Sequence, residues 1–340
     1  MKFIWIIPIF TLLSSCHGRT SNVIDINTQK TAIADILKTD KSINESNGII
    51  YFSFDNGNTW EDKSNGLPED MTLTDIAVSN ELIGATTKQH GVFLYNFSEN
   101  SWAKTADRPQ TTSNLDALIF RDDKLFVGSE NAGVFVSADK GKTWLSINEG
   151  LGNLTIRKFA VVDHKLYVGT NGGLYFLNDN GHKWALEYGQ NSLQVNGITE
   201  FENEIYIGTN QGIFKSLKGK KDWKQIMANR SLHNISSDDR MVYAMTYNEL
   251  MVSGDKGNTW RSIQKGLPAQ LYSFQLLKKD SAIFVGQWDG IYKKQTLTGW
   301  TYSSAGLPSK FAVTEMKIYQ NILVIGCSER KLRKGMTTDK

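Results

Sequence analysis

The chain has 340 residues, 40% of them hydrophobic, and its 38 Lys and Arg against 35 Asp and Glu leave a formal net charge of +3. A chain of this length buries most of its apolar surface on folding. The small, scattered charge gives no electrostatic footprint for nucleic acid. No run of about 18 consecutive apolar residues follows the N-terminal region, which excludes a later membrane-spanning helix.

The N-terminal residues have the pattern of an export signal. A positive charge at Lys2 is followed by an apolar run from Phe3 to Leu13, which is too short to span a bilayer. The run ends in LSSC, whose last residue is Cys16, and this resembles the bacterial lipobox, in which the peptide is cut before a lipidated cysteine. We therefore expect a signal peptide over 1–15, a lipidated tether over 16–46 and a place in the bacterial cell envelope, with the outer membrane favoured. An ordinary secreted protein is the alternative.

An internal repeat of about 40 residues follows. Four octapeptides read nearly alike: SFDNGNTW at 53–60, SADKGKTW at 137–144, LNDNGHKW at 177–184 and SGDKGNTW at 253–260. They resemble the Asp box, also called the BNR repeat, whose pattern is S-x-D-x-G-x-T-W. Three weaker copies keep the tryptophan, and the spacings of the seven are 42, 42, 40, 39, 37 and 40: Trp60, Trp102, Trp144, Trp184, Trp223, Trp260 and Trp300. This period is typical of β-propeller blades.

Each repeat contains four segments that predict strands, named A to D from the axis outward. The first two strands of successive units are expected at 115–120 and 124–129, at 155–162 and 165–170, and at 196–201 and 204–209, because these stretches are rich in apolar and β-branched residues. The first copy supplies only strands C and D, from Gly48, whereas 313–319 and 321–326 supply only A and B. Pairing the two half-blades leaves no open edge. We predict an all-β, seven-bladed propeller of four-stranded blades over 47–334, with a tail over 335–340.

The residues that recur in the repeat turns are interpreted as structural. An Asp carboxylate accepts backbone N–H groups in a tight turn, a glycine supplies a positive φ, and the tryptophan covers the hairpin with an apolar ring. The same residues recur in several blades, whereas an active site is needed once. This structural set is Asp55, Gly57, Trp60, Asp139, Gly141, Trp144, Asp179, Gly181, Trp184, Asp255, Gly257 and Trp260.

The resemblance to other propellers implies that a ligand lies over the axis, on the face formed by the B–C and D–A loops, with the Asp boxes on the opposite rim. Turns before strand C supply Asn131, Asn171 and Asn210, which turn chemistry alone also explains. The turns at 89–91, 247–249, 287–290 and 328–330 differ from this pattern and add the candidates His90, Trp288, Asp289 and Arg330. Four scattered arginines could approach the same face and would suit an anionic ligand: Arg108, Arg157, Arg230 and Arg330. A ring beside a carboxylate suits a sugar or peptide site; packing of Trp288 on a neighbouring loop is the alternative.

No catalytic set is recognised. Sialidases share the resemblance but add a Phe/Tyr-Arg-Ile-Pro motif, and the nearest match, FRDD at 120–123, lacks Ile-Pro and falls in an A–B turn. A glycosidase in general needs two carboxylates across a cleft, and the pool to search is Glu130, Glu249, Asp289 and Glu329. Motifs for zinc hydrolases, phosphate loops and serine hydrolases are absent, so we expect no metal and no cofactor.

The sequence thus predicts a non-catalytic binding or assembly propeller. We expect a monomer that touches the membrane through its lipid only, holds a protein, peptide or glycan on the B–C/D–A face and binds no nucleic acid. Asp-box proteins such as the photosystem II assembly factor and sortilin-type receptors, which this chain resembles, hold peptides or protein partners. A sialidase-like or other glycoside hydrolase is the alternative, and a carbohydrate-binding receptor without hydrolysis is the third hypothesis.

Overall fold

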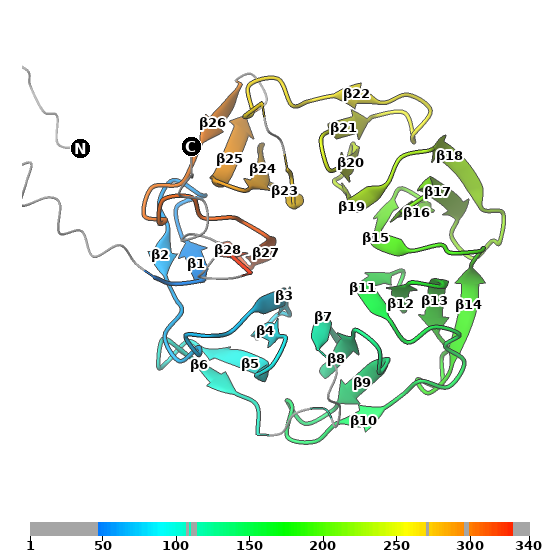
Figure 1. The fold of residues 1–340 in the computed structure, drawn as a ribbon, viewed down its shortest axis with the longest axis horizontal. Helices are drawn as coiled ribbons and strands as arrows, with labels where there is room; N and C mark the ends of the chain where they lie inside the picture. The colour runs from blue at the N-terminus through cyan, green and yellow to red at the C-terminus, as the bar shows by residue number, and fades with distance from the viewer. Residues whose placement is uncertain (1–46, 107–108, 110–113, 270–271, 296–298, 329–340) are drawn as a thin grey trace, which may run out of the picture. The chain divides into compact units, whose positions relative to one another are not determined.

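The computed structural model describes residues 47–106, 109, 114–269, 272–295 and 299–328. In these ranges all regular structure is β, and 28 strands form seven four-stranded antiparallel sheets arranged as the blades of a propeller (Figure 1). The prediction of an all-β, seven-bladed propeller is confirmed. The predicted signal peptide, Cys16, the tether, Arg108, Arg330 and the tail lie outside the described residues. Among the described residues, no helix has the length and hydrophobicity needed to cross a membrane.

Six blades are built from four consecutive strands, and we number them in chain order. Blade 1 contains β3 (Leu73–Val78), β4 (Ile83–Thr87), β5 (Gly91–Asn96) and β6 (Ser101–Lys104). Blade 2 contains β7 (Leu115–Arg121), β8 (Lys124–Ser129), β9 (Val134–Ser137) and β10 (Leu145–Ser146). Blade 3 contains β11 (Ile156–Val162), β12 (Lys165–Thr170), β13 (Gly173–Leu177) and β14 (Trp184–Tyr188). Blade 4 contains β15 (Val195–Phe201), β16 (Glu204–Thr209), β17 (Gly212–Leu217) and β18 (Lys224–Ala228). Blade 5 contains β19 (Leu232–Ser237), β20 (Val242–Thr246), β21 (Leu250–Ser253) and β22 (Arg261–Ser262). Blade 6 contains β23 (Gln275–Lys279), β24 (Ala282–Gln287), β25 (Gly290–Gln295) and β26 (Trp300–Tyr302).

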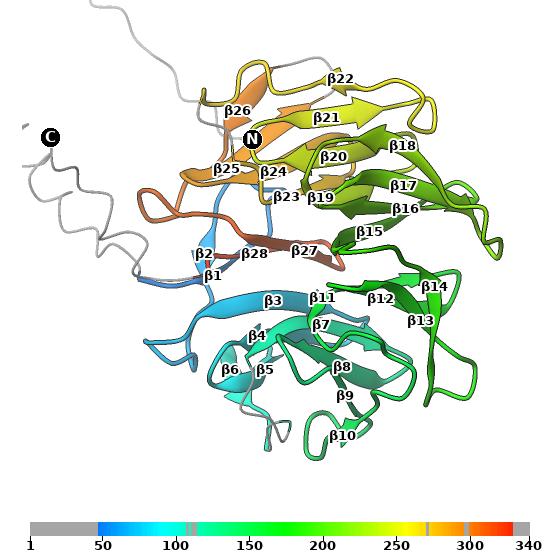
Figure 2. The same ribbon diagram turned by 45° about the vertical axis from the view of Figure 1, so that its right-hand side comes forward.

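The seventh blade closes the ring from both ends of the chain. Its strand order is β2 (Glu61–Asp62), β1 (Ile50–Ser53), β28 (Ile322–Gly326) and β27 (Glu315–Tyr319). The β1–β28 pairing is antiparallel, with Ile50 opposite Gly326 and Ser53 opposite Leu323. Both views show the blue β1 beside the red end of the chain (Figures 1 and 2). The predicted closure by two half-blades is therefore confirmed, and it pairs two strands that would otherwise be open edges.

The hydrophobic core is divided among the seven joints between neighbouring blades. One buried cluster, for example, joins Ala117 and Phe126 of blade 2 to Ile156 and Val168 of blade 3. Strand B of several blades has a glycine next to its last residue because the next blade approaches it closely there. A Cβ on Gly128 would stand 2.2 Å from Ile156 Cγ2, so a side chain there would push blades 2 and 3 apart.

The repeat tryptophans also make a contact that the sequence did not predict, a hydrogen bond between neighbouring blades. Trp184, which is 1% exposed, donates its indole N–H to the Ile147 carbonyl of the preceding blade (2.6 Å). Trp60, Trp102 and Trp300 make the equivalent bond to the blade before their own. Trp260 alone of these keeps to its own turn, bonding Gly257 O (3.1 Å). These tryptophans therefore tie neighbouring blades together through their indole N–H groups.

The repeat turns at 53–60, 137–144 and 253–260 share one hydrogen-bond pattern. In the second of them, the Thr143 backbone N–H and hydroxyl both donate to Asp139 (2.9 and 2.7 Å), and these bonds, with one from Ser137, lower the pKa of Asp139 to about 2. The buried Gly141 N–H donates to Ser137 Oγ (2.8 Å), and Gly141 has a φ of 81°. At 177–184, Leu177 stands in place of the serine and Asn178 Oδ1 accepts the Lys183 N–H instead (3.2 Å).

Candidate functional site

Five blades carry a β-bulge at the start of their innermost strand. In β3, β7, β11, β15 and β19 the register with strand B slips by one residue, and the extra residues are Thr74, Asp116, Arg157, Asn196 and His233. A bulge leaves its residue out of the ladder and re-aims the side chain. All five side chains line one cavity of 530 Å³. We call these residues the bulge ring. They differ chemically although they occupy the same position of the repeat, and this distinguishes them from the repeated turn residues.

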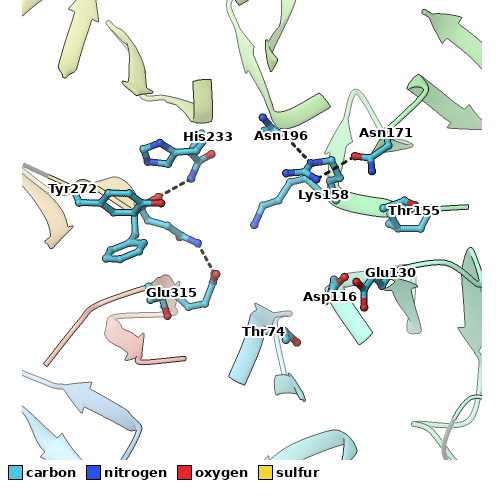
Figure 3. A pocket seen from close by; sticks show the side chains of 16 residues that line it. Thr74, Asp116, Glu130, Thr155, Lys158, Asn171, Asn196, His233, Tyr272 and Glu315 are labelled. Carbon is cyan, nitrogen blue, oxygen red and sulfur yellow. Dashed lines mark hydrogen bonds between the residues drawn. The ribbon is translucent and has the colours of Figure 1, made fainter. Parts of the chain in front are cut away.

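The cavity lies where the inner strands of the blades begin, on the side of the B–C turns (Figure 3). Asn171 and Glu130, from the B–C turns of blades 3 and 2, line it together with the bulge ring. Figure 3 shows His233 and Tyr272 on one side of the opening and Asn171 and Asn196 on the other. The cavity therefore has two unlike walls.

The polar wall is organised around Arg157. Its Nε donates to Asn196 Oδ1 and its Nη1 to Asn171 Oδ1 (3.1 Å). Burial lowers the pKa of Arg157, whereas Tyr247 and Asp116 act in the opposite direction. The guanidinium is thus held in plane by two amide oxygens and lies near a carboxylate, so its charge is already partly compensated.

Asp116 and Glu130 stand next to each other on the same wall. Glu130 accepts a hydrogen bond from Asn114 Nδ2 (2.8 Å). Burial and the neighbouring Glu130 charge raise the pKa of Asp116 to about 6. Within the described ranges, Asp116 has electrostatic neighbours but its carboxylate receives no hydrogen bond. It is therefore a carboxyl group with open acceptor positions that face the cavity.

The opposite wall is aromatic. Tyr272 and Phe274 line the cavity, and their ring centroids are 4.5 Å apart. His233 stacks on Tyr272 at 5.4 Å with an interplanar angle of 9°, and burial lowers the pKa of His233. Tyr247 is not among the residues that line the cavity; it stands outside, at the rim, 5.4 Å from both His233 and Tyr272, and is 56% exposed. Trp288 lies behind this layer, 5.9 Å from Phe274 in an edge-to-face contact.

A network of charged side chains lies at the axis, and two of its members, Lys158 and Glu315, also line the cavity. Asp75 Oδ1 lies 3.8 Å from Lys158 Nζ and 3.5 Å from Lys317 Nζ, and Asp75 Oδ2 accepts the Leu118 N–H (3.0 Å). Burial opposes ionisation of Asp75, but the two lysines outweigh it and lower its pKa. Burial and the Asp75 charge raise the pKa of Glu315 to about 7. These groups come from the inner strands of blades 1, 3 and 7, so the network joins three blades through their side chains.

The residues predicted from the sequence divide into three groups. Asn171 and Glu130 line the cavity. Trp288 is half-buried and supports the rings that line it, which is the packing alternative stated above. The others lie elsewhere. His90 pairs with Asp70 (3.1 Å), and the Asp289 carboxylate accepts the Tyr292 hydroxyl (2.9 Å).

Two of the remaining predicted residues belong to turns. Asn210 accepts the Gln194 N–H (2.9 Å) and donates to Ser192 O (3.0 Å), so it fixes its loop. Asn131 lies between β8 and β9 and is not among the residues that line the cavity. Glu249, from the pool of candidate carboxylates, is paired with Arg230.

Of the bulge ring, sequence reasoning brought only Arg157 to this face, and it missed the other four residues and the aromatic wall. A signal was present, because each ring residue is the polar position at the start of a strand A, shortly after the preceding repeat tryptophan. These positions hold Thr, Asp, Arg, Asn and His in turn, and such variation at one repeat position is what a ligand-reading surface requires. The bulge that aims them inward is a feature of the backbone and leaves no residue pattern of its own.

Comparison with known proteins supports the fold. No family model matches the chain. An oligoxyloglucan-reducing end-specific xyloglucanase of Emericella nidulans is 25% identical over 154 residues, which cover 42% of this chain and 18% of that protein. The chain therefore spans less than a fifth of that relative.

Three solved structures share the architecture. YCF48 bound to a D1 peptide has a TM-score of 0.61 at 13% identity, covering 81% of this chain and 96% of that one. The extracellular domain of a hybrid two-component system of B. thetaiotaomicron has a TM-score of 0.63 at 14% identity (78% and 40% covered). BamB of Moraxella catarrhalis has a TM-score of 0.54 at 11% identity (74% and 82% covered). At these identities the likeness shows the fold alone, so the chain is a seven-bladed β-propeller with YCF48 and BamB among its structural neighbours.

Proposed function

We propose that this propeller is a non-catalytic binding module that holds its ligand in the axial cavity on the B–C/D–A face. The observation that carries the proposal is the bulge ring, because five blades depart from regular pairing at the same point and all five extra side chains meet in one cavity. A bulge costs ladder hydrogen bonds, so its recurrence at a cavity is best explained by what the cavity binds. YCF48, whose structure contains a bound D1 peptide, is an example of a propeller of similar fold that binds a peptide.

The test compares two exposed arginines on opposite faces. The full chain is presented to a glycan array, a peptide library and cross-linked envelope extract. We expect at least one specific ligand, whose affinity falls at least about fivefold in Arg157→Ala, the level of a hot-spot contact. Arg240→Ala, in the A–B turn of blade 5, should bind as the native protein does. A ligand that responds to Arg240→Ala and ignores Arg157→Ala would place the binding face elsewhere.

A glycoside hydrolase is the second candidate, and one observation favours it. The carboxyl group of Asp116 has a pKa raised to about 6 and faces Glu130 in the cavity, and a raised pKa is what a general acid needs. A panel of fluorogenic glycosides tests it. Under our proposal no glycoside is turned over. Hydrolysis that Asp116→Asn abolishes and Asp289→Asn leaves intact would replace the binding module by an enzyme.

The repeat and the anchor complete the proposal. The chain is an Asp-box propeller, which the shared hydrogen bonds of the turns at 53–60, 137–144 and 253–260 support.

It is a lipoprotein of the cell envelope, lipidated on Cys16, which the LSSC motif after an apolar run supports. We expect the native protein to fractionate with membranes at the mass of a chain cleaved before Cys16 and acylated, and Cys16→Ser to lose both properties. A Cys16→Ser protein with unchanged mass and fractionation would refute the lipid anchor.

A further inference from the structure

The two unlike walls of the cavity restrict what it can hold. One wall offers aromatic rings, with Tyr247 presenting 56% of its surface at the rim, held in place by His233 and Tyr272. The other offers planar polar groups: two amides bound to Arg157, and the open carboxylate of Asp116. A matching ligand has an apolar face and, at its edges, several hydroxyl groups that can both donate and accept hydrogen bonds.

The charges disfavour an anionic ligand. The guanidinium of Arg157 already serves two amide oxygens and lies near Asp116, and Lys158 points its charge at Asp75. An added carboxylate would also meet Asp116 and Glu130, which stand together on the same wall. A cluster of free arginines, which bidentate recognition of a carboxylate uses, is not formed by the described residues.

The charge network at the axis disfavours a peptide that runs through the propeller. The Asp75–Lys158–Lys317 network joins side chains of three blades at the axis, so a peptide that threaded the propeller would have to separate these ion pairs. A compact ring lying across the mouth meets no such obstacle. It would contact both walls of a 530 Å³ cavity at once.

We infer that the axial cavity is a binding site for a neutral saccharide, one ring of which stacks on Tyr247 while its hydroxyls bond to Asp116 and Asn196. This inference rests on the proposed function and names its ligand class. The pyranose C–H face supplies the apolar surface that Tyr247 covers. Asp116, which lacks a donor among the described residues, accepts from a sugar hydroxyl. The Asn196 amide accepts from Arg157 and donates to Leu232 O (2.6 Å), which leaves one N–H and one oxygen lone pair for the ligand.

The experiment uses the full chain in a zwitterionic detergent, because glucoside and maltoside detergents are themselves saccharides. Binding is measured by calorimetry with neutral tetrasaccharides (cello-, xylo-, manno-, malto- and laminari-oligosaccharides) and with two anionic probes, sialyllactose and tetragalacturonate. We expect at least one neutral probe to bind with a Kd below about 1 mM and to be preferred over both anionic probes at least tenfold.

Matched variants locate the site. Tyr247→Ala should weaken binding at least about fivefold, whereas Tyr247→Phe, which keeps the ring, should stay within twofold. Tyr302→Ala is the control, because Tyr302 is also 56% exposed but its hydroxyl bonds Asp289 O outside the cavity. Asp116→Asn should weaken binding without lowering the thermal midpoint.

Three results would overturn the inference: no binding of any neutral probe at 5 mM, preference for an anionic probe, or full affinity in both Tyr247→Ala and Asp116→Asn. The first two leave the proposed function intact if another ligand still responds to Arg157→Ala. If no ligand responds to Arg157→Ala either, the proposed function, binding on the B–C/D–A face, is also refuted. The two failures are therefore distinguishable.

Discussion

Ser137 shows how one side chain holds a repeat turn. Its buried Oγ accepts the Gly141 N–H (2.8 Å) and donates to Asp139 Oδ1 (2.8 Å). Ser137→Ala leaves the buried Gly141 N–H without a partner, and an unsatisfied buried donor costs about 1–3 kcal/mol. We expect the free energy of unfolding in urea to fall by this amount. The exposed Ser231→Ala is the control, and equal stability of the two variants would contradict the role given to Ser137.

At the residue scale, the sequence predicted the turn chemistry better than the binding residues. Asn171 was found because Asn-Gly turns are visible as a pattern, and it does line the cavity. Asp116 and His233 were not found, because each looks like an ordinary strand residue until the bulge turns it toward the axis. Asp289 was chosen because it follows Trp288 in the sequence, but its carboxylate accepts a hydrogen bond from the Tyr292 hydroxyl. A single amino-acid sequence does not show which side chains from different strands contact one another in the fold.

At the scale of the elements, the contacts between blades are the feature that the sequence did not predict. The period of the tryptophans predicted seven blades, and the paired half-blades were correct because strand content can be counted. What each tryptophan covers depends on the packing angle between blades, which the repeat does not encode locally. The Gly128 approach to Ile156 is a second such feature, since its necessity becomes visible only when the next blade is in place.

Two tryptophans therefore provide a matched test of the joints. Trp184 is 1% exposed and bonds Ile147 O of the preceding blade, whereas Trp260 bonds Gly257 O within its own turn. Trp184→Phe loses a bond between blades and leaves buried space, so we expect it to lower the free energy of unfolding by at least about 1 kcal/mol more than Trp260→Phe. Equilibrium urea unfolding followed by circular dichroism measures both. Equal losses would show that the tryptophans stabilise hairpins and not joints.

At the scale of the whole molecule, the charge network at the axis couples distant parts of the ring. Asp75 from blade 1, Lys158 from blade 3 and Glu315 and Lys317 from blade 7 meet at the axis, and Gln275 from blade 6 donates to Glu315. Blades that are not neighbours in the ring, such as 1 and 3, thus contact one another through these side chains. Protonation of one group is therefore a property of the closed propeller, because the unfolded chain has no such meeting point.

The pH dependence of stability should report this coupling. Burial and Asp75 raise the pKa of Glu315 from its ordinary 4.5 to about 7, so between these values the folded state binds a proton that the unfolded state releases. Stability from this group is complete below about pH 4.5 and is lost as the pH rises toward 7. Glu315→Gln keeps an amide that can accept from Gln275 and donate to Asp75 without titrating. We expect the urea midpoint of the native protein to fall from pH 5 to pH 7.5 and that of Glu315→Gln to fall less. Glu81→Gln, at an exposed position, should follow the native curve. If Glu315→Gln followed it too, the proton would reside on another group, and the network would be a set of independent ion pairs.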